Sequence, residues 1–308
     1  TQAQDALSTP ENVYGMFSNA DLEFKDAVDK EGKKHPLTQG TFIKYLESDD
    51  RELRQSAYNN LYEAYGAYNN TLGSTLAGEV KKNIFNARAH NYKTARERAL
   101  SNNHIPEAVY DNLVATVHKY LPLLHKYTQL RKELLGIDDL KMYDIYTPLV
   151  KDVKFDMPYD EAKEWMLKAL EPMGEEYLDV VKEGLNHRWV DVYENKGKRS
   201  GGYSSGAHLT NPFILLNWSD TISDLYTLVH EFGHSAHSYF SRKNQPSNSS
   251  DYSIFVAEVA STCNEALLSD YMDKHLDDDR RLLLLNQELE RFRATLFRQT
   301  MFAEFEHK

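Results

Sequence analysis

The sequence feature that most constrains this chain is a His-Glu-x-x-His pattern formed by His230, Glu231 and His234. On an α-helix, residues four apart lie one above the other on a single face, so both imidazoles can reach one metal ion. Glu231 lies one residue round from that face, where its carboxylate can reach a water on the metal. This arrangement is typical of zinc metalloproteases, although these residues alone would equally suit a surface helix with two histidines.

The residues around the pattern favour a helix that is partly buried. Segment 223–229 combines good helix-starting residues with apolar ones, which predicts a helix that begins about two turns before His230. Gly233 lies inside that helix, where glycine costs roughly 1 kcal/mol relative to alanine. We interpret this glycine as a position where another backbone or a substrate approaches closely.

The third ligand separates the classes of zinc peptidase. A metzincin needs a third histidine ten residues after the first, but Phe240 occupies this position. The positions at which thermolysin-like and aminopeptidase-like enzymes place a glutamate are Ile254 and Ser253. The first downstream glutamate is Glu258, in a segment without Gly or Pro that continues as a predicted helix. We therefore assign Glu258 as the third ligand.

Two further residues lie close to these ligands in the predicted helices. Glu265 is two turns beyond Glu258 on the same face, where it can accept a hydrogen bond from a ligand histidine. An ordinary solvated role would fit Glu265 equally well. His237 follows the second histidine closely, but a fourth protein ligand would close the site, so we expect a packing or substrate-facing role.

The sequence resembles a known family at both predicted metal helices. Residues 230–237, which read His-Glu-Phe-Gly-His-Ser-Ala-His, and residues 255–265 look like the oligoendopeptidase F branch of the thimet-oligopeptidase family of zinc peptidases. Segments 197–203 and 212–218 look like the loop and edge strand that precede the zinc helix in that family. The resemblance implies a mainly α, helical zinc-peptidase fold with a small β element beside the motif helix.

The resemblance also implies a role for each residue of the site. One Zn²⁺ per chain would be held by His230, His234 and Glu258, in agreement with the spacing. Glu231 would be the catalytic base that activates the water on zinc, and Glu265 would hold a ligand in place. The function implied is that of a zinc-dependent endopeptidase that hydrolyses internal bonds of short peptides, since a helical wall in this family excludes folded proteins.

Two departures from the family leave other functions open. Family members are about twice this long and carry a His- and Tyr-containing segment after the zinc helices, whereas this sequence runs from Thr1 to Lys308. We therefore expect a fragment whose catalytic region is truncated on its C-terminal side and is completed by a further segment or a second chain. One alternative is a catalytically incomplete zinc-binding fragment, and another is a carboxydipeptidase of the angiotensin-converting type, which shares the ligand spacing.

A loop rich in Gly and Ser precedes the motif helix and is a candidate for substrate contact. Residues 197–206 have the composition of a mobile element, and the apolar strand predicted at 213–216 offers an edge on which an extended peptide can pair. We expect Tyr203 and His208 to contact substrate, and not to bind metal. A surface loop without a function is equally compatible with this composition.

The remaining pattern divides the chain into a helical N-terminal region, 1–136, and a zinc-binding catalytic region, 137–308. Apolar periodicity and turn residues predict a hairpin at 22–33, helices at 51–91, 106–135, 159–170 and 172–184, and a strand at 189–193. Aromatic residues between Tyr58 and Tyr68 recur at helical spacing, which predicts a core stripe.

Composition excludes several classes of function. The chain has 36 Lys and Arg against 47 Asp and Glu, a formal charge of −11, which argues against a nucleic-acid partner. Cys263 is the single cysteine and excludes a disulfide within the chain. The sequence has no run of eighteen apolar residues and no signal peptide, so we expect no membrane association and a cytoplasmic location.

Overall fold

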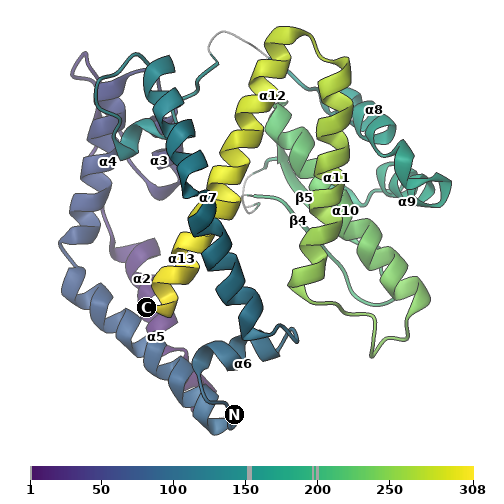
Figure 1. Cartoon of the computed structure of the whole chain (residues 1–308), viewed down its shortest axis with the longest axis horizontal. Helices are drawn as coiled ribbons and strands as arrows, with labels where there is room; N and C mark the ends of the chain where they lie inside the picture. The colour runs from purple at the N-terminus through teal and green to yellow at the C-terminus, as the bar shows by residue number, and fades with distance from the viewer. Residues whose placement is uncertain (1, 151–154, 196–197, 199–200) are drawn as a thin grey trace. The chain divides into compact units, whose positions relative to one another are not determined.

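The computed structural model describes residues 2–150, 155–195, 198 and 201–308, and the chain divides into two compact units (Figure 1). Unit 1 comprises residues 1–151 and 291–308, and unit 2 comprises residues 152–290. Helices dominate both units, which confirms the predicted mainly α class. The division expected between residues 136 and 137 remains a prediction.

Unit 1 consists of helices and one short hairpin. Its elements are α1 (Gln2–Leu7), α2 (Thr9–Met16), η1 (Phe17–Asp21), β1 (Ala27–Val28), β2 (Lys34–His35), α3 (Gln39–Leu46), α4 (Arg51–Gly66), α5 (Asn69–Ala89), α6 (Ala95–Ser101), α7 (Glu107–Leu134), η2 (Met142–Asp144), η4 (Phe292–Phe297) and α13 (Arg298–His307). The hairpin is antiparallel, as predicted, but its paired strands are only two residues long. Helix α7 continues through Pro122 and matches the predicted helix at 106–135.

The single long helix predicted at 51–91 is wrong, because the structure has α4 and α5 in its place. Helix α4 ends at Gly66, and Tyr68 adopts φ −114° and ψ 21°, outside the helical region. Glycine weakens a helix because it loses the most backbone entropy, and apolar periodicity does not register this break. The buried face of α4 is Leu53, Ala57 and Leu61. Tyr68 is exposed, so the expected aromatic core stripe is only partly formed.

A buried ion cluster connects α4 to η2 in unit 1. The Asp144 carboxylate is fully buried and accepts hydrogen bonds from Arg51 Nη2 and Arg54 Nη2, both at 2.9 Å. Burial alone would raise the pKa of Asp144, but the hydrogen bonds from the two guanidinium groups outweigh it and lower this pKa below its ordinary value. The carboxylate is therefore held in its charged form.

Unit 2 places a small sheet beside a group of helices. Its elements are α8 (Tyr159–Ala169), η3 (Glu171–Met173), α9 (Glu175–Asn186), β3 (Val190–Tyr193), β4 (Tyr203–Ser205), β5 (Phe213–Trp218), α10 (Ile222–Asn244), α11 (Ile254–His275) and α12 (Asp278–Arg291), whose last residue belongs to unit 1. Helix α8 and strand β3 agree with the sequence predictions. The helix predicted from residue 172 begins instead at Glu175, because Gly174 adopts φ +86° and separates it from a 3₁₀ turn.

The sheet has the order β3-β5-β4, so β5 is its central strand. Strand β5 pairs parallel to β3 and antiparallel to β4, with Ser204 opposite Ile214. The prediction that strand 213–216 offers an edge is therefore wrong, since the last part of the Gly- and Ser-rich segment itself forms the edge strand β4. The mobility predicted for residues 197–206 remains a prediction, and residues 197, 199 and 200 of that segment lie outside the described residues.

Helix α10 lies at the centre of unit 2 and beside both β5 and α11 (Figure 1). Thr221 caps it in a reciprocal arrangement, in which the Thr221 hydroxyl accepts from the Asp224 N–H and the Asp224 carboxylate accepts from the Thr221 N–H. Leu225, Leu228 and Phe232 are fully buried. The helix therefore begins about two turns before His230, as predicted. No helix in the described part of the chain is both long and apolar enough to cross a membrane.

Candidate metal centre

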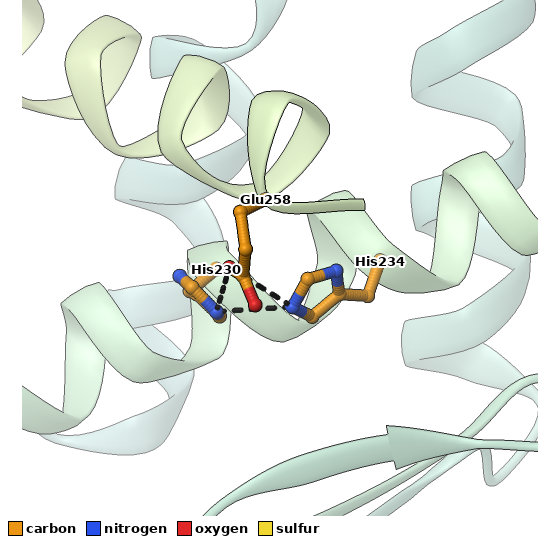
Figure 2. Close-up of side chains that lie close together, drawn as sticks. All are labelled: His230, His234 and Glu258. Carbon is orange, nitrogen blue, oxygen red and sulfur yellow. Dashed lines mark hydrogen bonds and ion pairs between the residues drawn. The ribbon is translucent and has the colours of Figure 1, made fainter. Parts of the chain in front are cut away.

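His230 and His234 lie one turn apart on α10, and Glu258 reaches them from the second turn of α11 (Figure 2). The three facing atoms, His230 Nε2, His234 Nε2 and Glu258 Oε2, are 3.1, 3.5 and 3.6 Å apart. The point equidistant from the corners of such a triangle is about 2.0 Å from each, the bond length that zinc makes with imidazole nitrogen and carboxylate oxygen. The arrangement of these three side chains therefore fits a zinc ion.

The His230 imidazole is oriented by a hydrogen bond on its other nitrogen, since His230 Nδ1 lies 2.6 Å from Glu265 Oε1. An Nδ1–H that donates to this carboxylate leaves Nε2 of His230 unprotonated, with its lone pair directed at the centre of the triangle. The His234 ring bonds to the backbone of Ala257. Burial lowers the pKa of His234, helped by its neighbour His230, which favours the neutral form that metal binding needs.

Glu265 raises the pKa of His230, whereas the pKa of His234 is lowered. Burial alone would lower the pKa of His230, but the hydrogen bond and the charge of Glu265 outweigh it and raise this pKa. Glu265 thus increases the basicity of the imidazole, which strengthens a metal ligand. Sequence spacing left the role of Glu265 open, and the structure places its carboxylate directly on a candidate ligand.

Glu231 lies beside the cluster and not among the three converging atoms. It is only 6% exposed, and its Oε2 has no hydrogen-bond partner in the described part of the chain. Burial raises the pKa of Glu231, while the charge of His230 and the backbone N–H of Ser204 partly offset this effect. A buried carboxylate oxygen without a partner, next to three converging ligand atoms, is suited to receive a proton from a water.

The two predicted substrate contacts lie outside this cluster. The Ser204 hydroxyl bonds to Ser235 of α10 at 2.8 Å. Because side chains alternate along a strand, Tyr203 points to the opposite face of the sheet. There it lines a cavity of about 750 Å³ whose lining does not include the cluster residues. His208 lies in the turn after β4, half-buried. Their contact with substrate remains a prediction.

Three residues at the site were not found by sequence reasoning. Ser204 and Ala257 act through backbone groups, which no side-chain spacing reveals. Asn264 is buried between α10 and α11, and its only sequence signal is its position beside Glu265. His237, expected to have a packing or substrate-facing role, stacks on Tyr252 with ring centroids 3.7 Å apart.

In this helical unit, two histidines of one helix and a glutamate of the next converge beside a buried glutamate. This arrangement defines the class of metallopeptidases. Comparison with known proteins agrees. The sequence model of peptidase family M3 matches residues 44–308, and the chain belongs to this family.

The similar proteins identify the branch. Oligopeptidase PepF of Bacillus subtilis (strain 168) is 57% identical over 307 residues, which are 99% of this chain and 46% of that protein. The structure of oligoendopeptidase-F from Enterococcus faecium has a TM-score of 0.75 at 39% identity and is matched over 99% of this chain and 48% of its own. A peptidase structure from Chlamydophila abortus has a TM-score of 0.88 at 39% identity, over 99% of this chain and 51% of its own.

These matches confirm the predicted resemblance to the oligoendopeptidase F branch and the helical peptidase fold. The chain spans about half the length of the relatives it matches.

Proposed function

We propose that this chain carries the zinc site of an endopeptidase that hydrolyses internal bonds of short peptides. One observation supports this most strongly: three ligand atoms converge, and the buried Glu231 carboxylate interacts electrostatically with two of these ligands, His230 and Glu258. The names of the relatives, oligopeptidase and oligoendopeptidase, support short peptides as the substrate class. We also propose a cytoplasmic location.

His230, His234 and Glu258 would hold one Zn²⁺ per chain. Zinc in such a site lowers the pKa of a coordinated water and polarises the scissile carbonyl. Three protein ligands leave one coordination position for substrate or water.

Glu231 would act as the general base and then as the general acid. Its raised pKa brings it closer to working pH, where a carboxylate accepts a proton from the attacking water and returns it to the leaving amine efficiently. The backbone N–H of Ser204 holds the carboxylate in place from β4. Because β4 is an edge strand in the described sheet, an extended peptide that pairs with it would lie beside Glu231. We propose Tyr203 and His208 as substrate contacts near this strand.

The test combines zinc content with cleavage of a quenched fluorescent peptide, on the wild-type chain and on Glu231→Gln. Zinc at one per chain in both proteins, with cleavage only by the wild type, would support the proposal. A chain without zinc would overturn the ligand assignment. Equal cleavage by the variant would overturn the role of Glu231.

The half-length match favours a second candidate, a zinc-binding fragment that needs a further segment or a second chain for catalysis. This candidate predicts zinc at one per chain without cleavage by either protein. Mass spectrometry of the products separates the remaining alternative, since a carboxydipeptidase releases C-terminal dipeptides and an endopeptidase cleaves internal bonds.

A further inference from the structure

Asn264 connects three helices of unit 2 beside the candidate ligands. Its side chain is 1% exposed on α11, and its Nδ2 donates to the backbone carbonyl of Val229 on α10 at 3.1 Å. Its Oδ1 accepts from the Tyr177 hydroxyl of α9 at 2.9 Å. Burial raises the pKa of Tyr177 to about 12, so this hydroxyl remains a donor at any working pH. Both ends of the Asn264 amide are therefore satisfied, in a single orientation.

Asn264 and Glu265 of α11 each bond to a residue of α10, and the two bonds join residues that are neighbours in sequence on both helices. Val229 precedes His230, and Asn264 precedes Glu265, which bonds to His230 at 2.6 Å. The Asn264 amide bonds to the backbone of α10, whereas the Glu265 carboxylate bonds to the imidazole of His230. Together they fix the rotation of α11 about its axis, and this rotation sets where Glu258 points.

Gly233 fixes the distance between the same two helices. A Cβ at this position would lie 2.6 Å from Ser261 Cα and 2.9 Å from the Ala260 carbonyl oxygen. Both obstacles are backbone atoms, so no side chain can turn away to make room. The close approach inferred from the sequence at Gly233 is thus confirmed, and the neighbouring element is the backbone of α11 between Glu258 and Glu265.

We propose that Asn264 is a positioning residue for the metal site, which acts with Gly233 to hold α11 in the register that brings Glu258 onto the two imidazoles. This inference rests on the proposed zinc site. A metal–ligand bond tolerates displacements of about 0.2 Å, far less than a helix shifts when it loses a packing contact. Zinc affinity is therefore the property most sensitive to Asn264.

The experiment measures zinc affinity by chelator competition for the wild type, Asn264→Asp and Asn264→Ser. Both substitutions remove the amide donor to Val229, and aspartate adds repulsion between its carboxylate and that carbonyl. We expect affinity to fall about 10- to 100-fold, the range for residues that orient metal ligands. The Co²⁺-substituted variants should also lose intensity in the visible absorption that reports tetrahedral geometry.

Leu284→Ala is the control for a general loss of stability. Leu284 is buried in the hydrophobic core that also contains Val229, and it lies on α12, which carries none of the candidate ligands. With unfolding monitored by circular dichroism, this variant should lose stability and keep the zinc affinity of the wild type. If Asn264→Asp fails to fold, the smaller and uncharged Asn264→Ser and the separate variant Gly233→Ala carry the test.

The outcomes separate this inference from the proposed function. A wild-type chain that binds no zinc means that the zinc site itself is wrong. A wild-type chain that binds zinc, with unchanged affinity in Asn264→Ser and Gly233→Ala, overturns the positioning role and leaves the proposed function intact. Equal losses in these variants and in Leu284→Ala would also overturn it, because affinity would then follow stability alone.

Discussion

Glu265 should control metal affinity without binding metal itself. Its carboxylate receives the Nδ1–H of His230 at 2.6 Å and raises the pKa of that imidazole. We expect Glu265→Ala to weaken zinc binding about 10- to 100-fold, because the ring loses its fixed tautomer and orientation. Chelator competition measures this, with Glu161→Ala, an exposed carboxylate on α8, as the control that should bind like the wild type. Equal affinity in both variants would contradict the assigned role.

At the residue scale, the sequence predicted the positions of side chains that follow a spacing rule. It did not predict the contacts of residues for which no such rule exists. The choice of Glu258 followed from helical geometry after Ile254 and Ser253 had excluded other classes, and the structure brings Glu258 to both histidines. The hydrogen bond from Ser204 to Glu231 uses a backbone N–H, whose direction depends on how β4 pairs. The outward direction of Tyr203 depends on the same pairing, which single-sequence patterns do not determine.

Replacement by alanine should change the free energy of unfolding in opposite directions at two helical glycines with different surroundings. At Gly184 of α9 a Cβ would lie 2.7 Å from Trp189 and 2.8 Å from Phe232, and both rings are buried. We expect Gly184→Ala to lower the free energy of unfolding by about 1–3 kcal/mol through overpacking. At Gly73 of α5 nothing lies within 4 Å, so Gly73→Ala should raise it by about 1 kcal/mol. Urea unfolding of both variants checks this, and a stabilised Gly184→Ala would contradict the packing.

The ion cluster that connects α4 to η2 should make unit 1 sensitive to acid. The pKa of Asp144 lies below its ordinary 3.8, so the cluster contributes fully above about pH 3.8, and the contribution is lost as the pH falls through the folded-state value. Asp144→Asn should cost about 3 kcal/mol near neutral pH, because it leaves Arg54 buried without a counter-charge.

Stability measured from pH 7 to pH 2 tests this expectation. The difference between wild type and Asp144→Asn should stay constant above about pH 3.8 and shrink below it. A difference that is independent of pH throughout would show that the Asp144 charge contributes nothing.

At the element scale, helix and strand identity followed from pattern, while boundaries and strand order did not. The start of α10 was predicted because helix-starting and apolar residues coincide in segment 223–229, and the structure places the cap close by at Thr221. The break at Gly66 and the central place of β5 escaped prediction for different reasons. Apolar periodicity does not register a local break at a glycine, whereas the strand order depends on contacts between residues distant in sequence.

Long-range contacts also explain why it is difficult to predict which helices belong to each compact unit. In unit 1, His118 of α7 bonds to Glu304 of α13 at 2.6 Å across 186 residues of sequence. Nothing in the apolar spacing of α13 specifies α7 as its neighbour. The metal ligands are easier to predict from sequence, since His230 and Glu258 are only 28 residues apart on consecutive helices that pack together.

Because all three candidate ligands and Glu265 belong to unit 2, metal binding should stabilise this unit selectively. A ligand that binds only the folded state adds about 2.7 kcal/mol at 100 times its Kd. We therefore expect zinc to slow hydrogen exchange in α10 and α11, where amides lie on the ligand-bearing turns, and removal by chelator to restore the faster rates. Helices α4 and α5 of unit 1 hold no ligand and should exchange equally with and without zinc. The variant His234→Ala should abolish the protection of α10 and α11. If α4 and α5 gained as much protection as α10 and α11, the metal would act on both units, and the assignment of its ligands to unit 2 alone would be incomplete.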